Sequence, residues 1–316
     1  MSDCADARLC LLEYLSEHGW KPSRDSGRDE IAGLCPLHQE TRPSFYVNRR
    51  KQVFYCHGCG RGGGLPQLRL WLEGDRFGQG KPNPGELLEE TYAFYQQHLL
   101  RSPEALVYLR QRGIYDPRVI EQMRIGYAPG ACLRGYLVKR GYRPAAMMTA
   151  GLIDARARDR FFRCLTFPLE ETASLYGRQI DRGIWKHRFL PRTKGGLYGW
   201  EQAQAFAWVI VVEGLFDVAA LWQAGFPQAV AALGSHLNSK QLAQLSSCTK
   251  RRVYVSFDAD LNGNGQGAAS QLIGQLQKAG IVALRVKLPE GHDPASFFAA
   301  GATGWNYQCL LKAVRP

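Results

Sequence analysis

The 316 residues are enough for two or three domains with a proper core. The formal net charge of +12 indicates an anionic partner, although a merely soluble basic protein is the alternative. Nucleic acid is the first candidate, because no amphipathic or lipidation signal points to a membrane and no apolar run reaches about 18 residues. Asp3, Asp6 and Arg8 argue against a signal peptide, so a cytoplasmic protein is expected. The odd number of cysteines, nine, favours metal binding and buried thiols over a disulfide framework.

The first chemically distinctive feature is a pair of short cysteine and histidine clusters. Seventeen residues separate the cluster of Cys35 and His38 from the cluster of Cys56 and Cys59. Two short ligand pairs on either side of a hairpin-length spacer are typical of a structural zinc site. A buried thiol is the alternative for any single cysteine, but it does not explain four ligands at this spacing. His57 is the competing histidine, and His38 is the one spaced like a ligand.

The spacer itself predicts a β-hairpin, with strands at residues 44–47 and 52–55. Its turn is basic, with Arg49, Arg50 and Lys51 in succession. Aromatic faces stack on unpaired bases and cations follow phosphates, so the hairpin is a candidate contact surface for single-stranded DNA. The alternative is that its apolar residues are simply core beneath the zinc. Those residues are Phe45, Val47, Val53 and Tyr55.

A Gly- and Pro-rich stretch at residues 74–85 reads as a linker and marks a domain boundary. One helix is expected before the cysteine clusters, at residues 5–18. Three more are expected after the linker, at residues 86–97, 102–112 and 117–124.

Three apolar, strand-like runs farther along the chain each end in acidic residues. The run at 208–212 precedes Glu213, the run at 253–257 precedes Asp258 and Asp260, and the run at 283–288 precedes Glu290 and Asp293. Unbroken β-branched runs are typical of buried parallel strands, whose carboxyl ends share one edge of the sheet. Clustered carboxylates repel each other unless a cation neutralises them. The pattern therefore predicts a Mg²⁺ or Mn²⁺ site.

Simpler explanations exist for some of these acids. Asp217 has the position of a first-turn helix acid, and Asp293 before Pro294 has that of an N-cap. An EF-hand beginning at Asp258 is excluded by Ala269 at the twelfth position, where a glutamate is required. A dinucleotide fingerprint at residues 263–268 is disfavoured, because the acids before it would repel a pyrophosphate.

Residues 130–205 are strongly basic and include strand-like runs at 164–169 and 174–180. A charge run is often only a solvated surface. Here, however, it lies directly before the acid-ended strands, and a basic rim beside an acidic metal site suits a polymer of phosphates.

Together these motifs resemble the bacterial DnaG-type primases. The first module resembles their zinc-binding domain at residues 35–38, 41–45 and 55–63. Residues 211–217, 232–235 and 257–260 resemble their TOPRIM fold. Connecting segments at 108–114, 125–129 and 160–169 agree in order.

The resemblance implies an α+β and α/β protein, with an N-terminal zinc ribbon followed by a DnaG-type RNA polymerase domain built on a central parallel sheet. The implied division is a zinc-binding domain at 1–73, a linker at 74–85, the basic part of the primase core at 86–205, a TOPRIM domain at 206–300 and a tail at 301–316.

The implied activity is synthesis of short RNA primers on single-stranded DNA from ribonucleoside triphosphates, with one structural Zn²⁺ and catalytic Mg²⁺ or Mn²⁺. Glu213, Asp258 and Asp260 would be catalytic and hold the metal, and Asp217 and Asp293 would complete the acidic cluster. In the family, basic residues guide the phosphates of the template and of the nucleotide. The resemblance places Arg160, Arg178, Arg188 and Lys194 near those positions.

Departures from the family pattern leave alternatives open. Asp-Ala-Asp at 258–260 replaces the commoner Asp-Gly-Asp, and His292 stands where the family often has an acid. Full-length members carry a helicase-binding domain after the TOPRIM fold, so this chain is expected to recruit its helicase differently, to lack one, or to belong to a plasmid, phage or transposable element. A TOPRIM nuclease and a non-catalytic single-strand binding or loading factor are the competing functions. A primase would associate with the nucleoid during replication.

Overall fold

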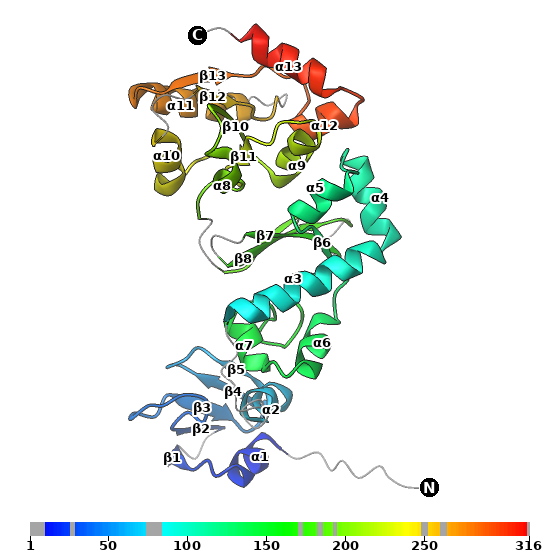
Figure 1. Cartoon of the computed structure of the whole chain (residues 1–316). Coiled ribbons are helices and arrows are strands. Elements are labelled where there is room, and N and C mark those ends of the chain that lie inside the picture. Colours follow the sequence, from blue (N-terminus) through cyan, green and yellow to red (C-terminus); the bar gives the residue numbers. More distant parts are fainter. Residues whose placement is uncertain are drawn as a thin grey trace. The chain divides into compact units, whose positions relative to one another are not determined.

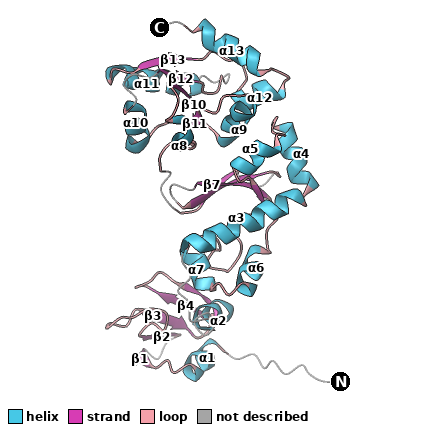
Figure 2. Ribbon diagram, in the orientation of Figure 1, coloured by secondary structure: helices cyan, strands magenta, loops and turns pink. Residues whose placement is uncertain are grey.

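The computed structural model forms two compact units. Unit 1 combines Met1–Thr91 with Pro129–Phe162, and unit 2 combines Tyr92–Ala128 with Arg163–Pro316. The chain is traced in Figure 1, and its helices and strands are distinguished in Figure 2. Within the described residues, no helix combines the length and apolar character needed to cross a membrane. The residues that the structure describes are 10–25, 29–73, 84–169, 173–181, 186–191, 195–247, 252–259 and 264–314.

Unit 1 contains a five-stranded antiparallel sheet with strands in chain order, drawn in blue in Figure 1. The predicted hairpin is confirmed, with each strand one residue later than expected. The other three strands were not predicted, and β5 is a run of three glycines without any apolar signal. The strands are β1 (Pro22–Asp25), β2 (Glu30–Gly33), β3 (Phe45–Asn48), β4 (Val53–Cys56) and β5 (Gly62–Gly64).

The core of unit 1 lies on one face of this sheet. Alternate residues of the hairpin point inward, so that Phe45, Val47 and Phe54 are buried while Tyr46 and Tyr55 are exposed. Helix α1 (Leu11–Glu17) adds Leu11 and Leu15 to the same cluster. Three further helices belong to this unit: α2 (Leu65–Glu73), α6 (Leu133–Lys139) and α7 (Pro144–Thr149).

Unit 2 contains a four-stranded parallel sheet in the order β11-β10-β12-β13. The central strand β10 (Trp208–Val212) has the bounds predicted from its sequence. Its alternate residues enter two different cores: Ile210 and Val212 pack with α9, whereas Val209 and Val211 pack with α11. The unbroken apolar run is therefore explained by burial on both faces. The neighbouring strands are β11 (Ala229–Ala231), β12 (Arg252–Val255) and β13 (Val282–Arg285).

Helices cover both faces of the parallel sheet. One core contains residues of α9 (Leu215–Gln223), α12 (Pro294–Ala299) and α13 (Gly304–Ala313). The other contains residues of α8 (Trp200–Ala203), α10 (Ser239–Ser246) and α11 (Asn264–Lys278). The segment expected to be a C-terminal tail thus includes a helix that buries Tyr307 and Leu311.

A second, antiparallel sheet in unit 2 runs in the order β6-β7-β8-β9. The predicted strand β7 (Cys164–Leu169) is confirmed at its expected bounds, and β8 (Ser174–Gln179) ends one residue early. The other two strands are β6 (Gly126–Ala128) and β9 (His187–Phe189). The three helices expected after the linker are confirmed as α3 (Pro84–Leu100), α4 (Pro103–Gln111) and α5 (Pro117–Gln122).

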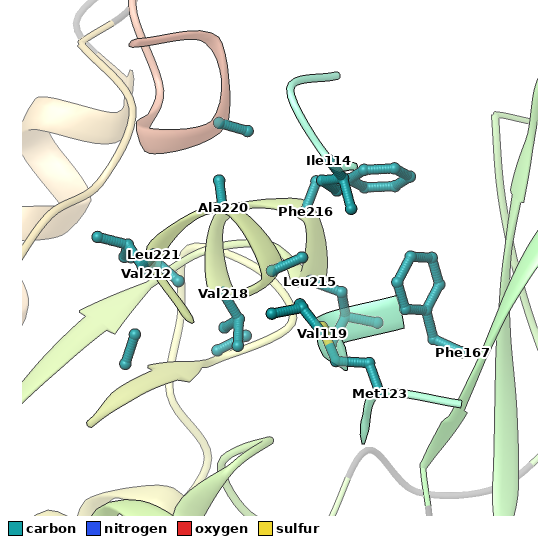
Figure 3. Close-up of a cluster of buried hydrophobic side chains, with 14 of the residues drawn as sticks. Ile114, Val119, Met123, Phe167, Val212, Leu215, Phe216, Val218, Ala220 and Leu221 are labelled. Carbon is teal, nitrogen blue, oxygen red and sulfur yellow. The ribbon is translucent and has the colours of Figure 1, made fainter. Parts of the chain in front are cut away.

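The apolar face of α9 joins the two sheets of unit 2. Figure 3 shows Phe216 of α9 beside Ile114 and Leu215 beside Val119, with Phe167 of β7 close by. The rings of Phe167 and Phe216 meet edge to face with centroids 5.2 Å apart. The helix that follows Glu213 is therefore fixed by packing, and this packing holds the carboxyl edge of β10 in place.

Candidate metal centres

The four predicted zinc ligands come together in unit 1. Cys35 follows β2, Cys56 ends β4, and His38 and Cys59 lie in the adjoining turns. One ligand atom from each of Cys35, His38, Cys56 and Cys59 lies within 4.8 Å of the others. Zinc bonds of about 2.0–2.3 Å in a tetrahedron put ligand atoms roughly 3.6–3.8 Å apart. The separation of 3.9 Å between Cys56 Sγ and His38 Nδ1 fits this requirement.

Without a cation, the three clustered cysteines work against one another's ionisation. Burial raises the pKa of Cys35 well above its usual value, and the neighbouring Cys56 and Cys59 thiols raise it further. Burial also acts against ionisation of Cys56, but the contact with the Ser44 side chain and the hydrogen bond from the backbone of Cys59 lower the pKa of Cys56 overall. Three thiolates this close together require a neutralising metal. The donor set of three sulfurs and one imidazole suits one Zn²⁺.

The competing histidine, His57, has a different environment. It is exposed, and its ring contacts Tyr46 and Tyr55 edge to face at 5.2 and 4.9 Å. The zinc group therefore contains His38 and not His57. Glu40, which the sequence analysis did not single out, contacts this group through its Oε2, 3.1 Å from His38 Nε2.

In unit 2, Glu213 and Asp258 lie at the carboxyl edge of the parallel sheet, as predicted from their strands. Strands β10 and β12 are neighbours, and the backbone N–H of Asp258 donates to Glu213 Oε1 at 3.4 Å. Both residues are half-buried. Asp260 lies outside the described residues. Among the residues that are described, the acids at this edge do not form a group of three with oxygens within 4.8 Å.

Asp217 is buried and both of its oxygens accept backbone hydrogen bonds. Oδ2 accepts from Gly214 N and Oδ1 from Ala295 N, each at 3.1 Å. Burial raises the pKa of Asp217 well above its usual value, and the charges of Asp293 and Asp258 raise it further. These contacts tie the start of α9 to the start of α12. A role for Asp217 as a metal ligand stays a prediction.

Asp293 is the N-cap of α12, which is the simpler role that the sequence analysis considered for it. Its Oδ1 accepts from Ser296 N at 2.5 Å, and Pro294 is the first helical residue. Its Oδ2 lies 3.7 Å from Arg112, whose guanidinium sits over the ring of Phe216 at 5.1 Å. Asp293 therefore has a structural partner, and metal ligation by this residue also stays a prediction.

The loop before α12 is also tied to the loop that carries Asp258. Ala259 N donates to His292 O at 3.0 Å, and Gly291 N donates to Ala259 O at 2.8 Å. These bonds hold the predicted acids Asp258 and Asp293 on one edge of the sheet, whatever their individual roles.

The predicted basic residues are distributed over both units. Arg178 of β8 donates to His187 Nε2 across the strand pair at 2.8 Å, and Arg188 follows on β9. Arg160 belongs to unit 1, where its Nε donates to Gly151 O. Lys194 lies outside the described residues. The three basic residues of the hairpin turn, Arg49, Arg50 and Lys51, are exposed.

Comparison with known proteins matches the two regions that contain these candidate sites. Residues 23–70 match the family model described as CHC2 zinc finger, and residues 210–298 match the model described as Toprim-like. The first match contains all four members of the zinc group. The second contains Glu213, Asp217, Asp258 and Asp293.

Longer similarities cover nearly the whole chain. It is 33% identical to a DNA primase of Synechocystis over 96% of this chain and 56% of that protein. It is 31% identical to a DNA primase of Aquifex aeolicus over 89% of this chain and 65% of that protein. The solved zinc-binding and RNA polymerase domains of the Aquifex aeolicus primase match with a TM-score of 0.66 and 26% identity, over 98% of this chain and 84% of that one.

The motifs, the fold and these relatives agree on one assignment. The CHC2 zinc finger, the Toprim-like region and the primase relatives over about 90% of the chain fit a primase of the DnaG type. The chain spans 56% and 65% of the length of the two curated relatives above.

Proposed function

We propose that this protein synthesises short RNA primers on single-stranded DNA by divalent-metal-dependent nucleotidyl transfer. The observation that carries the proposal is the presence in one chain of a zinc group and of Glu213 and Asp258 after the carboxyl ends of adjacent parallel strands. The relatives named above are DNA primases, and the solved DnaG primase catalytic domain bound to ssDNA matches with a TM-score of 0.62 and 25% identity.

The acidic edge supplies the chemistry in this proposal. Glu213, Asp258 and Asp260 would hold Mg²⁺ or Mn²⁺. When bound, this ion would neutralise triphosphate charge and stabilise an in-line transition state. The protein fixes Glu213 through the packing of β10 and α9, and it fixes Asp258 through hydrogen bonds of its own backbone and that of Ala259. Arg178 and Arg188 would neutralise phosphates of the template or of the incoming nucleotide.

The zinc sheet offers a surface for unpaired bases on the face opposite its core. Tyr46 and Tyr55 are cross-strand partners and are 38% and 48% exposed. With His57 they form an exposed ring cluster near a basic turn. The alternative that the hairpin residues are core holds for Phe45 and Val47 but not for Val53 and Tyr55. Proteins that bind single-stranded nucleic acid commonly combine exposed aromatic rings, which stack on bases, with cations that contact the phosphates.

Replacing Tyr55 by alanine is expected to weaken binding of single-stranded DNA by about 5- to 150-fold, which corresponds to the loss of one stacked base. The exposed ring contributes no core packing, so thermal unfolding should change little. Fluorescence anisotropy with a labelled oligonucleotide measures the effect. Val53→Ala is the matched control, because Val53 is exposed on the same strand two residues away and has no aromatic face. Equal affinity of Tyr55→Ala and wild type would rule out this surface.

Two other functions use the same features. A TOPRIM nuclease would use the same acids for hydrolysis, and a loading factor would use the zinc sheet without catalysis. End-labelled single-stranded DNA incubated with Mg²⁺ distinguishes them: shortening without nucleotides favours the nuclease, and binding without any reaction favours the loading factor. A replicative helicase as partner and association with the nucleoid are further parts of the proposal.

A further inference from the structure

Glu40 is at the centre of a hydrogen-bond network around the zinc group. Its side chain is only 11% exposed. Its Oε1 accepts from Cys35 N at 2.7 Å and from Ser44 N at 3.2 Å. Its Oε2 accepts from the Ser44 hydroxyl and lies 3.1 Å from His38 Nε2. One carboxylate therefore contacts the backbone of one zinc ligand and the ring of another.

Ser44 extends the network to a third ligand. Its Oγ lies 3.2 Å from Cys56 Sγ and accepts from Gly58 N at 3.2 Å. A side-chain carbon on Gly58 would lie 2.7 Å from this Oγ and 2.8 Å from His38 Nε2. The space around the network is thus filled closely, which holds Ser44 and His38 against Glu40.

The two nitrogens of His38 face different partners. Nδ1 lies 3.9 Å from Cys56 Sγ, on the side of the zinc group, and Nε2 lies 3.1 Å from Glu40. A neutral imidazole ligand must present a lone pair to the metal and carry its proton on the other nitrogen. A carboxylate that accepts this proton fixes both the tautomer and the orientation of the ring.

We propose that Glu40 is a positioning residue of the zinc site, which holds His38 with Nδ1 toward the metal. Glu40 does not contact the metal and takes no part in nucleotide chemistry. The inference rests on the zinc group alone, and it holds whether or not the chain makes primers.

The expected effect is a loss of zinc affinity. Removing an acceptor of this kind typically weakens metal binding by about 10- to 100-fold. Glu40→Gln, which preserves the shape of the side chain, is expected near about 10-fold, and Glu40→Ala near about 100-fold. Competition for zinc between the full chain and a chromophoric chelator measures both. Glu17→Gln is the control, because Glu17 is an exposed carboxylate of the same unit at the end of α1.

Making the same substitution in a His38→Cys variant distinguishes an effect through the His38 ring from a general effect on the structure of the loop. In His38→Cys the ligand is a thiolate without a second nitrogen, so Glu40 has no ring proton to accept. The effect of Glu40→Gln on zinc affinity should then shrink to about 2-fold or less, by comparison with the usual range for such contacts. Unchanged affinity of Glu40→Gln in the wild-type background, or an equal loss in both backgrounds, would overturn the proposal.

Discussion

Replacing Glu213 by glutamine is expected to reduce nucleotide incorporation by at least about 100-fold, while the binding of single-stranded DNA is retained. Glu213 directly follows the central strand β10, and its Oε1 accepts a hydrogen bond from Asp258 N at 3.4 Å. Glutamine preserves that acceptor and the size of the side chain, so the fold should be kept. It removes the negative charge that a divalent cation needs from this position.

Glu121→Gln is the matched control, because Glu121 is an exposed acid of α5 in the same unit and is not one of the acids predicted for the metal site. Its replacement should leave incorporation within about 2-fold of wild type, as expected for a surface charge. Incorporation of labelled ribonucleotides and oligonucleotide anisotropy are measured on the same preparations. Full incorporation by Glu213→Gln would show that the acidic edge is not the reaction centre.

Removal of zinc is expected to unfold the zinc-binding sheet of unit 1. Structural zinc contributes about 10–16 kcal/mol to the folding of small zinc modules. The sheet here has a small core, and two of its buried members, Cys35 and Cys56, are themselves zinc ligands. Without the metal, burial of these two thiols adds little to the folding stability of the sheet, and the adjoining turns are no longer held by metal bonds.

A zinc-ligand variant tests this expectation more selectively than a chelator. Cys56→Ser should lose bound zinc, and protease should then cut within residues 29–73 while fragments of unit 2 persist. Cys309→Ser is the control, because Cys309 is an exposed cysteine of α13 outside the zinc group. Zinc content by mass spectrometry accompanies the digestion. A protease-resistant zinc-binding sheet in the metal-free variant would mean that the core alone holds it.

The elements that the sequence predicted well are those with a local residue pattern that is typical of the element. Strand β10 is apolar and β-branched because both of its faces are buried, and its bounds follow directly. The hairpin has alternating burial around a polar turn. The zinc ligands are identified by spacing, since a tetrahedral site needs two close pairs.

The elements that the sequence did not predict depend on distant partners. Strand β5 is three glycines, and only its pairing with β4 makes it a strand. Helices α6 and α7 join unit 1 although they follow β6 of unit 2 in the chain. No local pattern could reveal either fact.

The same limit applies to the sites. The burial of Asp217 follows from the position of α12, whose Ala295 donates to it from 78 residues away. Glu40 lies only two residues from His38, which was a usable signal, but its importance depends on how the turn folds back toward Cys35. Acids are recognised from sequence when they end strands, and not when they support ligands.

Primer synthesis by the purified chain tests the central claim most directly. Zinc-loaded protein, single-stranded DNA of varied sequence, labelled ribonucleotides and either Mg²⁺ or Mn²⁺ are the only components needed. The account predicts short labelled oligonucleotides that depend on both the template and the metal. Absence of product with every template and both metals, from protein that is folded and binds DNA, would contradict it.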